Sequence, residues 1–250
     1  MFEKIIEFSA PEVYYNLKQN HPTPIKINIP EWYKKLEHKI NYRTVKGCMP
    51  FLDTLTFGYS LYLPVDFKIE HNKTVTDEQG KDRKDSFSAT PLMRGGADLE
   101  INMNFSGKPE VHSPFQLEGS PLVDKNKNLP FYKILNPWII KTPPGYSCLF
   151  VPPLNNTDDR FSIIPGIVDT DTFDREINFP IVLNGDKYPN LDTTIVKGTP
   201  YAQVIPFKRD NWKMNVTKSK IKNKLLHNLL YPLRFIHNYR SDFWSKKQCK

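Results

Sequence analysis

The sequence is poor in cysteine and glycine, and it contains no long hydrophobic run. Its 250 residues include 3 cysteines, an odd number without Cys-x-x-Cys spacing, which argues against a disulfide framework and a structural zinc site. No stretch approaches the ~18 consecutive apolar residues of a membrane-spanning helix, and the N-terminus carries acidic residues where a signal peptide is basic. We therefore expect neither a membrane span nor secretion through a signal peptide.

The motifs of common catalytic sites are also missing. The sequence has no Gly-x-Ser-x-Gly, no P-loop and no dinucleotide-binding fingerprint. Its 6 histidines lack the His-x-Asp and His-x-x-x-His spacings of iron and zinc sites. We therefore expect no metal site and no cofactor.

The composition is that of a folded, β-rich protein. Hydrophobic residues make up 39% and aromatic residues 13% of the chain, enough for a core. The 22 prolines against 11 glycines, placed between short apolar runs, favour a sheet with many turns over a helical bundle. The predicted fold class is therefore mainly β. β-branched and aromatic residues predict strands at 54–62, 98–105, 138–141, 146–151, 161–167, 177–183 and 202–207.

The charge is divided between a nearly neutral body and a basic tail. Residues 213–250 contain ten Lys/Arg and one acidic residue, a net +9, so residues 1–212 carry −1 of the overall +8. We expect a β-rich globular domain over 1–212, with a short helix after Pro30 and an insertion or long loops at 70–135. Within that region, the charged stretch 71–86 is expected to be an exposed loop.

The tail over 213–250 predicts a basic amphipathic helix. From about Asn215 the apolar residues recur every three or four positions, while most lysines fall on other faces. Pro232 predicts a kink, followed by a second short helix over 233–244.

Lysines in the first half of the tail and aromatic residues in the second favour attachment to a protein partner. An anionic membrane surface and nucleic-acid phosphates are the alternatives. The residues expected to contact the partner are Lys218, Lys222, Leu225, Leu229, Phe235, Tyr239, Phe243 and Trp244.

Four segments resemble, in order, motifs of the deoxyuridine triphosphatase (dUTPase) and dCTP deaminase family. They are Phe-Gly-Tyr-Ser-Leu-Tyr at 57–62, Thr-Pro-Pro-Gly-Tyr at 142–146, Gly-Ile-Val-Asp-Thr-Asp at 166–171 and Lys-Gly-Thr-Pro-Tyr-Ala-Gln-Val-Ile at 197–205. The resemblance implies a compact β-clip sheet domain that usually forms a homotrimer. It also implies that Asp169 or Asp171 activates water if the chain is an enzyme, with Mg²⁺ needed for a nucleotide hydrolase. The implied ligand contacts are Tyr59, Ser60, Phe173 and Gln203.

The sequence departs from that family where the family binds phosphate. Ser60 stands in place of the opening aspartate, and Pro-Leu-Asn at 153–155 replaces the phosphate-contacting Arg-Ser-Gly. The family's Gly-rich C-terminal phosphate clamp is absent. The alternative role for Asp169 and Asp171 is structural, because aspartates also hold hairpin turns through side-chain hydrogen bonds to the backbone.

A second resemblance covers more of the chain. Segments at 45–53, 141–147, 166–171, 177–180 and 203–209 are similar to an uncharacterised family found in marine tailed phages and some bacteria. This resemblance implies a phage or bacterial setting, with the protein in the host cytoplasm or the virion, and it implies no mechanism.

Together these features favour a non-catalytic binding or structural accessory protein of a phage, attached to a partner through its C-terminal helix. One alternative is a divergent nucleotide-acting enzyme that uses Asp169 or Asp171. Another is a nucleic-acid-binding protein that acts through the basic tail.

Overall fold

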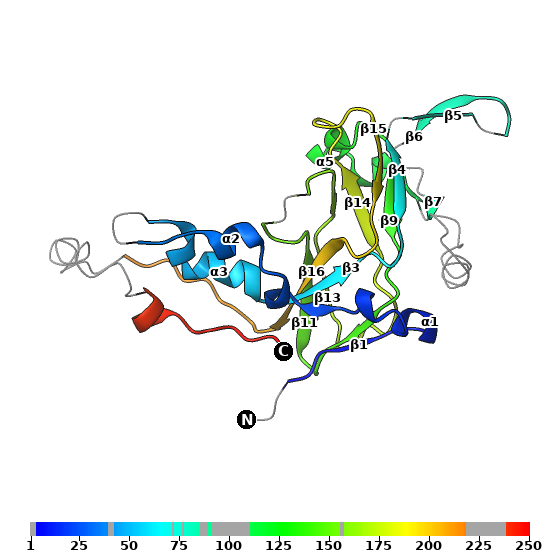
Figure 1. The fold of residues 1–250 in the computed structure, drawn as a ribbon. Helices are drawn as coiled ribbons and strands as arrows, with labels where there is room; N and C mark the ends of the chain where they lie inside the picture. The colour runs from blue at the N-terminus through cyan, green and yellow to red at the C-terminus, as the bar shows by residue number, and fades with distance from the viewer. Residues whose placement is uncertain are drawn as a thin grey trace. The chain divides into compact units, whose positions relative to one another are not determined.

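The computed structural model describes residues 4–39, 43–71, 73–76, 78–85, 90–91, 111–155, 158–218 and 239–250. It is mainly β, with several antiparallel sheets (Figure 1). The chain divides into two compact units. We call Met1–Thr23 with Tyr59–Lys208 the β-unit, and Pro24–Gly58 with Arg209–Lys250 the basic unit. The β-unit ends at Lys208, close to the boundary expected at residue 212. In contrast to the expectation, Pro24–Gly58 group with the C-terminal segment and not with the β-rich body.

The largest sheet of the β-unit has the strand order β13-β11-β16-β3-β2. Its strands are β13 (Gly166–Val168), β11 (Tyr146–Val151), β16 (Pro200–Lys208), β3 (Tyr59–Tyr62) and the short β2 (Thr23–Pro24). β16 pairs antiparallel with β11 along one edge and with β3 along the other, with Gln203 opposite Val151 and Ser60. The backbone of β16 is therefore hydrogen-bonded on both sides.

The remaining strands form smaller sheets. A four-stranded sheet has the order β12-β14-β9-β8, a three-stranded sheet has the order β15-β4-β7, and β1 pairs with β10. Their bounds are β1 (Glu7–Ser9), β4 (Phe67–His71), β7 (Thr90–Pro91), β8 (Val111–His112), β9 (Phe131–Ile134), β10 (Ile139–Lys141), β12 (Phe161–Ile163), β14 (Phe179–Leu183) and β15 (Leu191–Ile195).

The helices within the described residues are short. Those of the β-unit are α1 (Glu12–Tyr15), η1 (Lys18–Asn20), η4 (Pro114–Leu117) and α5 (Pro121–Lys125). Those of the basic unit are η2 (Ile25–Asn28), α2 (Glu31–Lys35), η3 (Val45–Gly47), α3 (Met49–Thr56) and the π-helical turn η5 (Tyr239–Phe243). Within the described residues, no helix is long and apolar enough to cross a membrane.

The core of the β-unit is formed by apolar residues of its sheets. Phe179 packs against Phe150 and Tyr201, with ring centroids 5.4 and 5.5 Å apart. Full burial of one such side chain stabilises a fold by about 1.5–3 kcal/mol, so this core carries most of the stability. Its largest fully buried members are Tyr201, Phe131, Phe150, Leu61, Leu63, Ile69, Ile140, Ile163, Leu183 and Ile195.

Several expected strands are confirmed. Residues 138–141, 146–151, 177–183 and 202–207 correspond to β10, β11, β14 and β16. The expected strand at 161–167 is instead two strands, β12 and β13, in different sheets, because Pro165 between them has no backbone N–H to donate. The strand expected at 98–105 lies outside the described residues.

The first half of the strand expected at 54–62 was wrong, because residues 54–56 belong to helix α3. Proline in the first turn suits a helix N-terminus, and Pro50 occupies that turn of α3. The hydroxyls of Thr54 and Thr56 donate to carbonyls one turn earlier in the helix. Burial of Met49 and Leu55 outweighs the strand propensity of the two threonines.

The charged stretch 71–86 is not a simple loop. It contains β5 (Lys73–Thr76) and β6 (Asp82–Asp85), which pair antiparallel as a hairpin (Figure 1). The Thr76 hydroxyl also donates to Asp82 across the pair. Alternating polar residues can form such a hairpin without contributing to the core, which is why composition alone suggested a loop.

The expected tail helices are only partly within the described residues. Residues 213–218 are exposed and have no regular secondary structure, so the predicted helix does not begin at Asn215. The rest of that helix and the kink at Pro232 lie outside the described residues. Within the range 233–244 of the predicted second helix, the described residues form the single turn η5. This turn ends with a hydrogen bond of 2.7 Å from Trp244 N to Tyr239 O.

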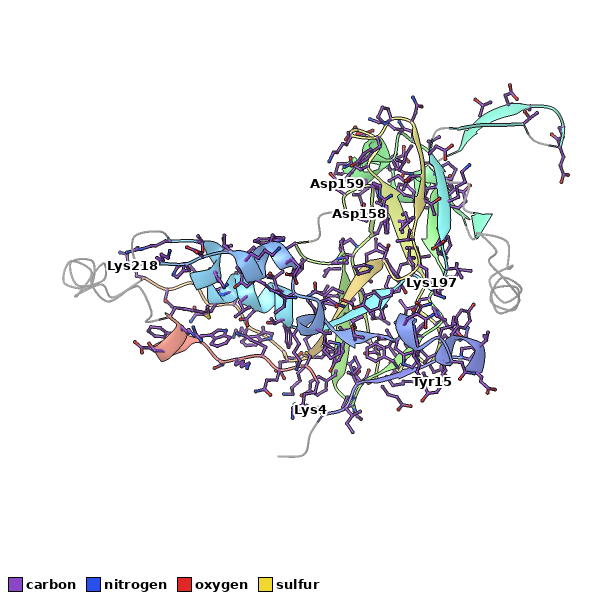
Figure 2. All side chains as sticks on the ribbon, in the orientation of Figure 1. Lys4, Tyr15, Asp158, Asp159, Lys197 and Lys218 are labelled. Carbon is purple, nitrogen blue, oxygen red and sulfur yellow. The ribbon has the colours of Figure 1, made fainter. Side chains whose placement is uncertain are left out.

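Replacing Tyr201 with phenylalanine tests the buried polar contacts of the core. The Tyr201 hydroxyl donates to Asn136 Oδ1 at 3.0 Å, and both residues are buried. Tyr201→Phe leaves that oxygen without its donor, so we expect the free energy of unfolding in urea to fall by about 1–3 kcal/mol. The exposed Tyr15, labelled in Figure 2, is the matched control. Tyr15→Phe should change the free energy of unfolding by less than about 0.5 kcal/mol. Equal effects of the two substitutions would contradict this role of Tyr201.

Candidate functional site

Asp169 and Asp171 lie on the turn that follows β13. Ser147 Oγ on β11 donates to Asp169 Oδ1 at 2.6 Å. The backbone N–H of Gly145 donates to Asp171 Oδ2 at 2.8 Å, and Gly145 has a φ of +82° that favours glycine. Both carboxylates therefore join this turn to the start of the neighbouring strand.

The backbone of this turn is held by further hydrogen bonds. The N–H groups of Thr172 and Phe173 both donate to Asp169 O, at 3.1 and 2.9 Å. Thr170 is fully buried, and its hydroxyl lies 2.7 Å from that of Thr142 and 3.4 Å from Cys148 Sγ. Burial raises the pKa of the Cys148 thiol to about 11, so this thiol remains protonated and unreactive at neutral pH.

The four expected ligand contacts differ in exposure. Tyr59 is half-buried with its ring centroid 5.4 Å from that of Phe8, and Phe173 is 40% exposed. Ser60 and Gln203 are buried and directly opposite each other on β3 and β16. Gln203 Oε1 accepts from Leu154 N at 3.0 Å, so this amide holds the loop after β11. Strands β16 and β11 separate Ser60 from the turn that carries the aspartates, so the six expected residues do not form one cluster.

Sequence reasoning missed a small cavity in the β-unit. It has a volume of about 180 Å³, below the ~300–1,000 Å³ of typical ligand pockets. Two adjacent aspartates, Asp158 and Asp159, lie in its wall just before β12 and near α5 (Figure 2). In the sequence, the adjacent charges of Asp-Asp-Arg at 158–160 are the feature that could have pointed to this cavity.

Each aspartate of this small cavity has a cationic partner. Arg160 donates to Asp158 through Nε at 2.9 Å and Nη2 at 2.7 Å. These bonds hold the pKa of the Asp158 carboxyl below its ordinary value of 3.8. Bonds from Lys187 Nζ and Tyr188 Oη, both 2.8 Å, similarly lower the pKa of Asp159. Two ionised, neutralised carboxylates fit a structural network better than a general base, whose pKa would lie near neutrality.

The stability of the β-unit should depend on pH through Asp158. A lowered carboxyl pKa contributes stability above the unfolded value of about 3.9, and this stability is lost as the pH falls through the folded value. At pH 7 we expect Asp158→Asn to lower the free energy of unfolding by about 1 kcal/mol, because the pair is partly exposed. The difference from wild type should shrink below about pH 4 in urea titrations.

Asp192→Asn is the control for that titration. Asp192 lies 3.6 Å from Lys68, and its side chain is 70% exposed. Its removal should leave the pH profile unchanged, because exposed pairs contribute little. If the free energy of unfolding of wild type and of Asp158→Asn changed with pH in parallel, Asp158 would not be the source of the pH dependence.

A larger cavity lies in the basic unit, and we call it the basic cavity. Its volume is about 620 Å³, within the range of ligand pockets. Its wall combines the end of α2, the segment after it, η3 and η5. Its cationic and aromatic lining residues are Lys34, Lys35, Lys39, Lys46, Tyr239 and Arg240. The sequence shows these lysines only as scattered charges.

The wall of the basic cavity is tightly packed at Gly47. A Cβ atom there would lie 2.3 Å from His38 Cε1 and 2.5 Å from His38 Nε2, so only glycine fits without displacing the imidazole. The ring is held from its other side, because Thr44 N donates to His38 Nδ1 at 3.0 Å. Nδ1 is thus the acceptor of this backbone hydrogen bond.

The end of the tail packs on its own chain. Trp244 Nε1 donates to both oxygens of Asp53 on α3, at 3.2 and 3.1 Å, and Lys247 Nζ lies 2.8 Å from the same carboxylate. Cys249 is 4% exposed, and its Sγ accepts from Gly58 N at 3.2 Å. The expected partner contact Trp244 therefore has an intramolecular partner.

The other expected partner contacts are exposed or lie outside the described residues. Tyr239 and Phe243 are 44% and 73% exposed, with stacked rings 6.5 Å apart. Lys218 is exposed. The expected contacts outside the described residues are Lys222, Leu225, Leu229 and Phe235.

Thiol labelling tests the packing of the C-terminal segment. Cys48 is exposed, whereas Cys148 and Cys249 are buried, so one thiol of the native protein should react rapidly. Asp53→Ala removes the acceptor of Trp244 and Lys247, and we expect Cys249 to react about tenfold faster, as the loss of ~1.4 kcal/mol implies.

Asp242→Ala is the control, because Asp242 is exposed and accepts from its neighbour Ser241 at 2.7 Å. It should leave the reactivity of all three thiols unchanged. An unchanged rate for Cys249 in Asp53→Ala would show that this anchor does not hold the segment.

Within the described residues, no three His, Cys, Asp or Glu side chains are grouped as metal ligands would be. In comparisons with known proteins, the chain matches no protein-family model and no curated protein.

Proposed function

We propose that this chain is a non-catalytic binding protein, a structural or accessory component of a tailed phage that acts in the host cytoplasm or the virion. One observation carries the proposal: the carboxylates best suited to catalysis, Asp169 and Asp171, accept hydrogen bonds from β11 and the turn before it. A general base acts within reach of a substrate proton in a pocket, and neither aspartate lines either of the two cavities described above.

The phage setting and the β-clip fold are parts of the same proposal. Support for the setting is the similarity of five sequence segments to the family of marine tailed phages. Support for a β-clip body is the order of the four dUTPase-like motifs, together with a mainly antiparallel sheet in which two of these motifs, on β3 and β16, pair directly. A β-clip body would also favour a homotrimer as the assembled form.

Attachment to a protein partner is proposed for the part of the tail that precedes Trp244. Exposed Tyr239 and Phe243 support this role, because aromatic side chains with a basic surround are typical of the centres of protein interfaces. Trp244 itself is excluded from the proposed contact, since its indole donates to Asp53 of the same chain.

The alternative is a divergent nucleotide-acting enzyme that uses Asp169 or Asp171 with Mg²⁺. The order of the dUTPase-like motifs favours it, whereas Pro-Leu-Asn at 153–155 opposes it, because these residues bring no cation to a triphosphate.

A panel of deoxynucleoside triphosphates with Mg²⁺ separates the two functions. For a binding protein we expect no product from dUTP, dCTP or the others above the level of Asp169→Asn, and no rise in the melting temperature. Asp169→Asn should lower the free energy of unfolding by about 1 kcal/mol, because Ser147 Oγ then donates to a neutral oxygen. Turnover by wild type that Asp169→Asn or Asp171→Asn abolishes would overturn the proposal in favour of the enzyme.

A further inference from the structure

The two units differ strongly in charge. The basic unit contains 17 Lys/Arg and 5 Asp/Glu, a net charge of +12, whereas the β-unit contains 18 and 22, a net charge of −4. The positive charge is therefore not confined to the tail, because Pro24–Gly58 carry part of it. A concave wall lined by charges of one sign concentrates the electrostatic field and attracts ions of opposite charge. Among the described residues, the wall of the basic cavity carries five Lys/Arg side chains and one carboxylate, so its charge is predominantly positive.

Among the described residues, three cations of the basic cavity have no carboxylate partner. Lys34 pairs with Glu31 at 2.6 Å and Lys39 with Glu37 at 2.7 Å, so these two lysines are neutralised locally. Within the described part of the chain, the side chains of Lys35 and Arg240 make no hydrogen bond or ion pair. The Lys46 side chain donates to the carbonyl of Lys34, at 2.7 Å, and to no carboxylate of the residues that the structure describes.

These three cations come from segments far apart in the sequence. Lys35 ends α2, Lys46 lies in η3, and Arg240 is carried by η5. Folding thus brings together like charges that repel one another, with Glu37 as the one carboxylate among the described residues of the wall. An arrangement that costs electrostatic energy in the free protein is stabilised when an anion with several charges binds.

Aromatic rings adjoin the cations. Tyr239 lines the basic cavity and precedes Arg240, and its ring stacks on that of Phe243, which is 73% exposed. Proteins that bind single-stranded nucleic acid combine a positively charged groove for the backbone with exposed rings on which bases stack. A duplex offers only its backbone here, because its bases are already stacked, and an acidic peptide offers no base.

We propose that the basic cavity binds the phosphodiester backbone of single-stranded nucleic acid through Lys35, Lys46 and Arg240, with a base stacked on Tyr239. This site goes beyond the proposed function, because it assigns a ligand to a cavity that neither Asp169 nor Asp171 lines. Binding here is independent of whether the chain turns over nucleotides.

Fluorescence anisotropy of the full-length protein with labelled oligo(dT) of about 12 nucleotides tests the site. Each phosphate contact on a single strand contributes about 0.7 to the slope of log affinity against log salt. Lys35→Gln/Arg240→Gln should therefore reduce this slope by about 1.4, measured between about 50 and 200 mM salt. Tyr239→Leu should weaken binding about tenfold and leave the slope unchanged, because stacking releases no counterions.

The control is Lys18→Gln/Arg175→Gln, which removes one exposed lysine and one exposed arginine from the β-unit. It should leave both affinity and slope unchanged, and circular dichroism should be the same for all variants, since every substituted side chain is exposed.

Three outcomes would overturn the inference. In the first, the oligonucleotide does not bind. In the second, the Lys35/Arg240 variant behaves like the Lys18/Arg175 control, so that any binding comes from other lysines. In the third, poly-glutamate or a duplex of equal length competes as well as unlabelled oligo(dT), so that charge alone is recognised. None of these outcomes bears on the nucleotide turnover that tests the proposed function.

Discussion

The central constraint on the β-unit is the pairing of β16 along both of its edges. Residues 203–208 pair with β11 and residues 200–204 with β3, and these two partner strands lie more than eighty positions apart in the sequence. The side chains of Tyr201, Ala202, Gln203 and Val204 on this strand are all buried. A consecutive buried run of this kind is typical of a strand covered on both faces.

This burial determines what the polar groups of the β-unit can do. A buried polar atom without a partner is costly, so Gln203 accepts from Leu154 and Tyr201 donates to Asn136. Asp169 and Asp171 serve the same purpose at the edge of the sheet, where they join the turn after β13 to the start of β11. The hydrogen bonds of Asp169 and Asp171 thus contribute to the structure of the β-unit.

The two units differ in the partners of their cationic side chains. In the β-unit, Arg160 and Lys187 lie on carboxylates. In the basic unit, Lys34, Lys39 and Lys247 also pair with carboxylates. However, Lys35, Lys46 and Arg240 line one cavity with no carboxylate partner among the described residues. A small aromatic cluster supports this arrangement, with the ring of buried Tyr33 stacked 5.9 Å from that of Phe51. Anchoring of the C-terminal segment on α3 brings Arg240 into the same unit as the lysines.

Local patterns in the sequence determined much of the β-unit: the mainly β class, four strands close to their observed bounds, and the helix after Pro30. They failed where burial overrides propensity, as in α3, where Thr54 and Thr56 are helical. Only the tertiary structure decided that Asp169 and Asp171 are hydrogen-bonded across the sheet, and that Arg240 shares a cavity with Lys35. The physical reason is that propensity and periodicity act between neighbours in sequence, whereas hydrogen bonds and electrostatic fields depend on distances in space.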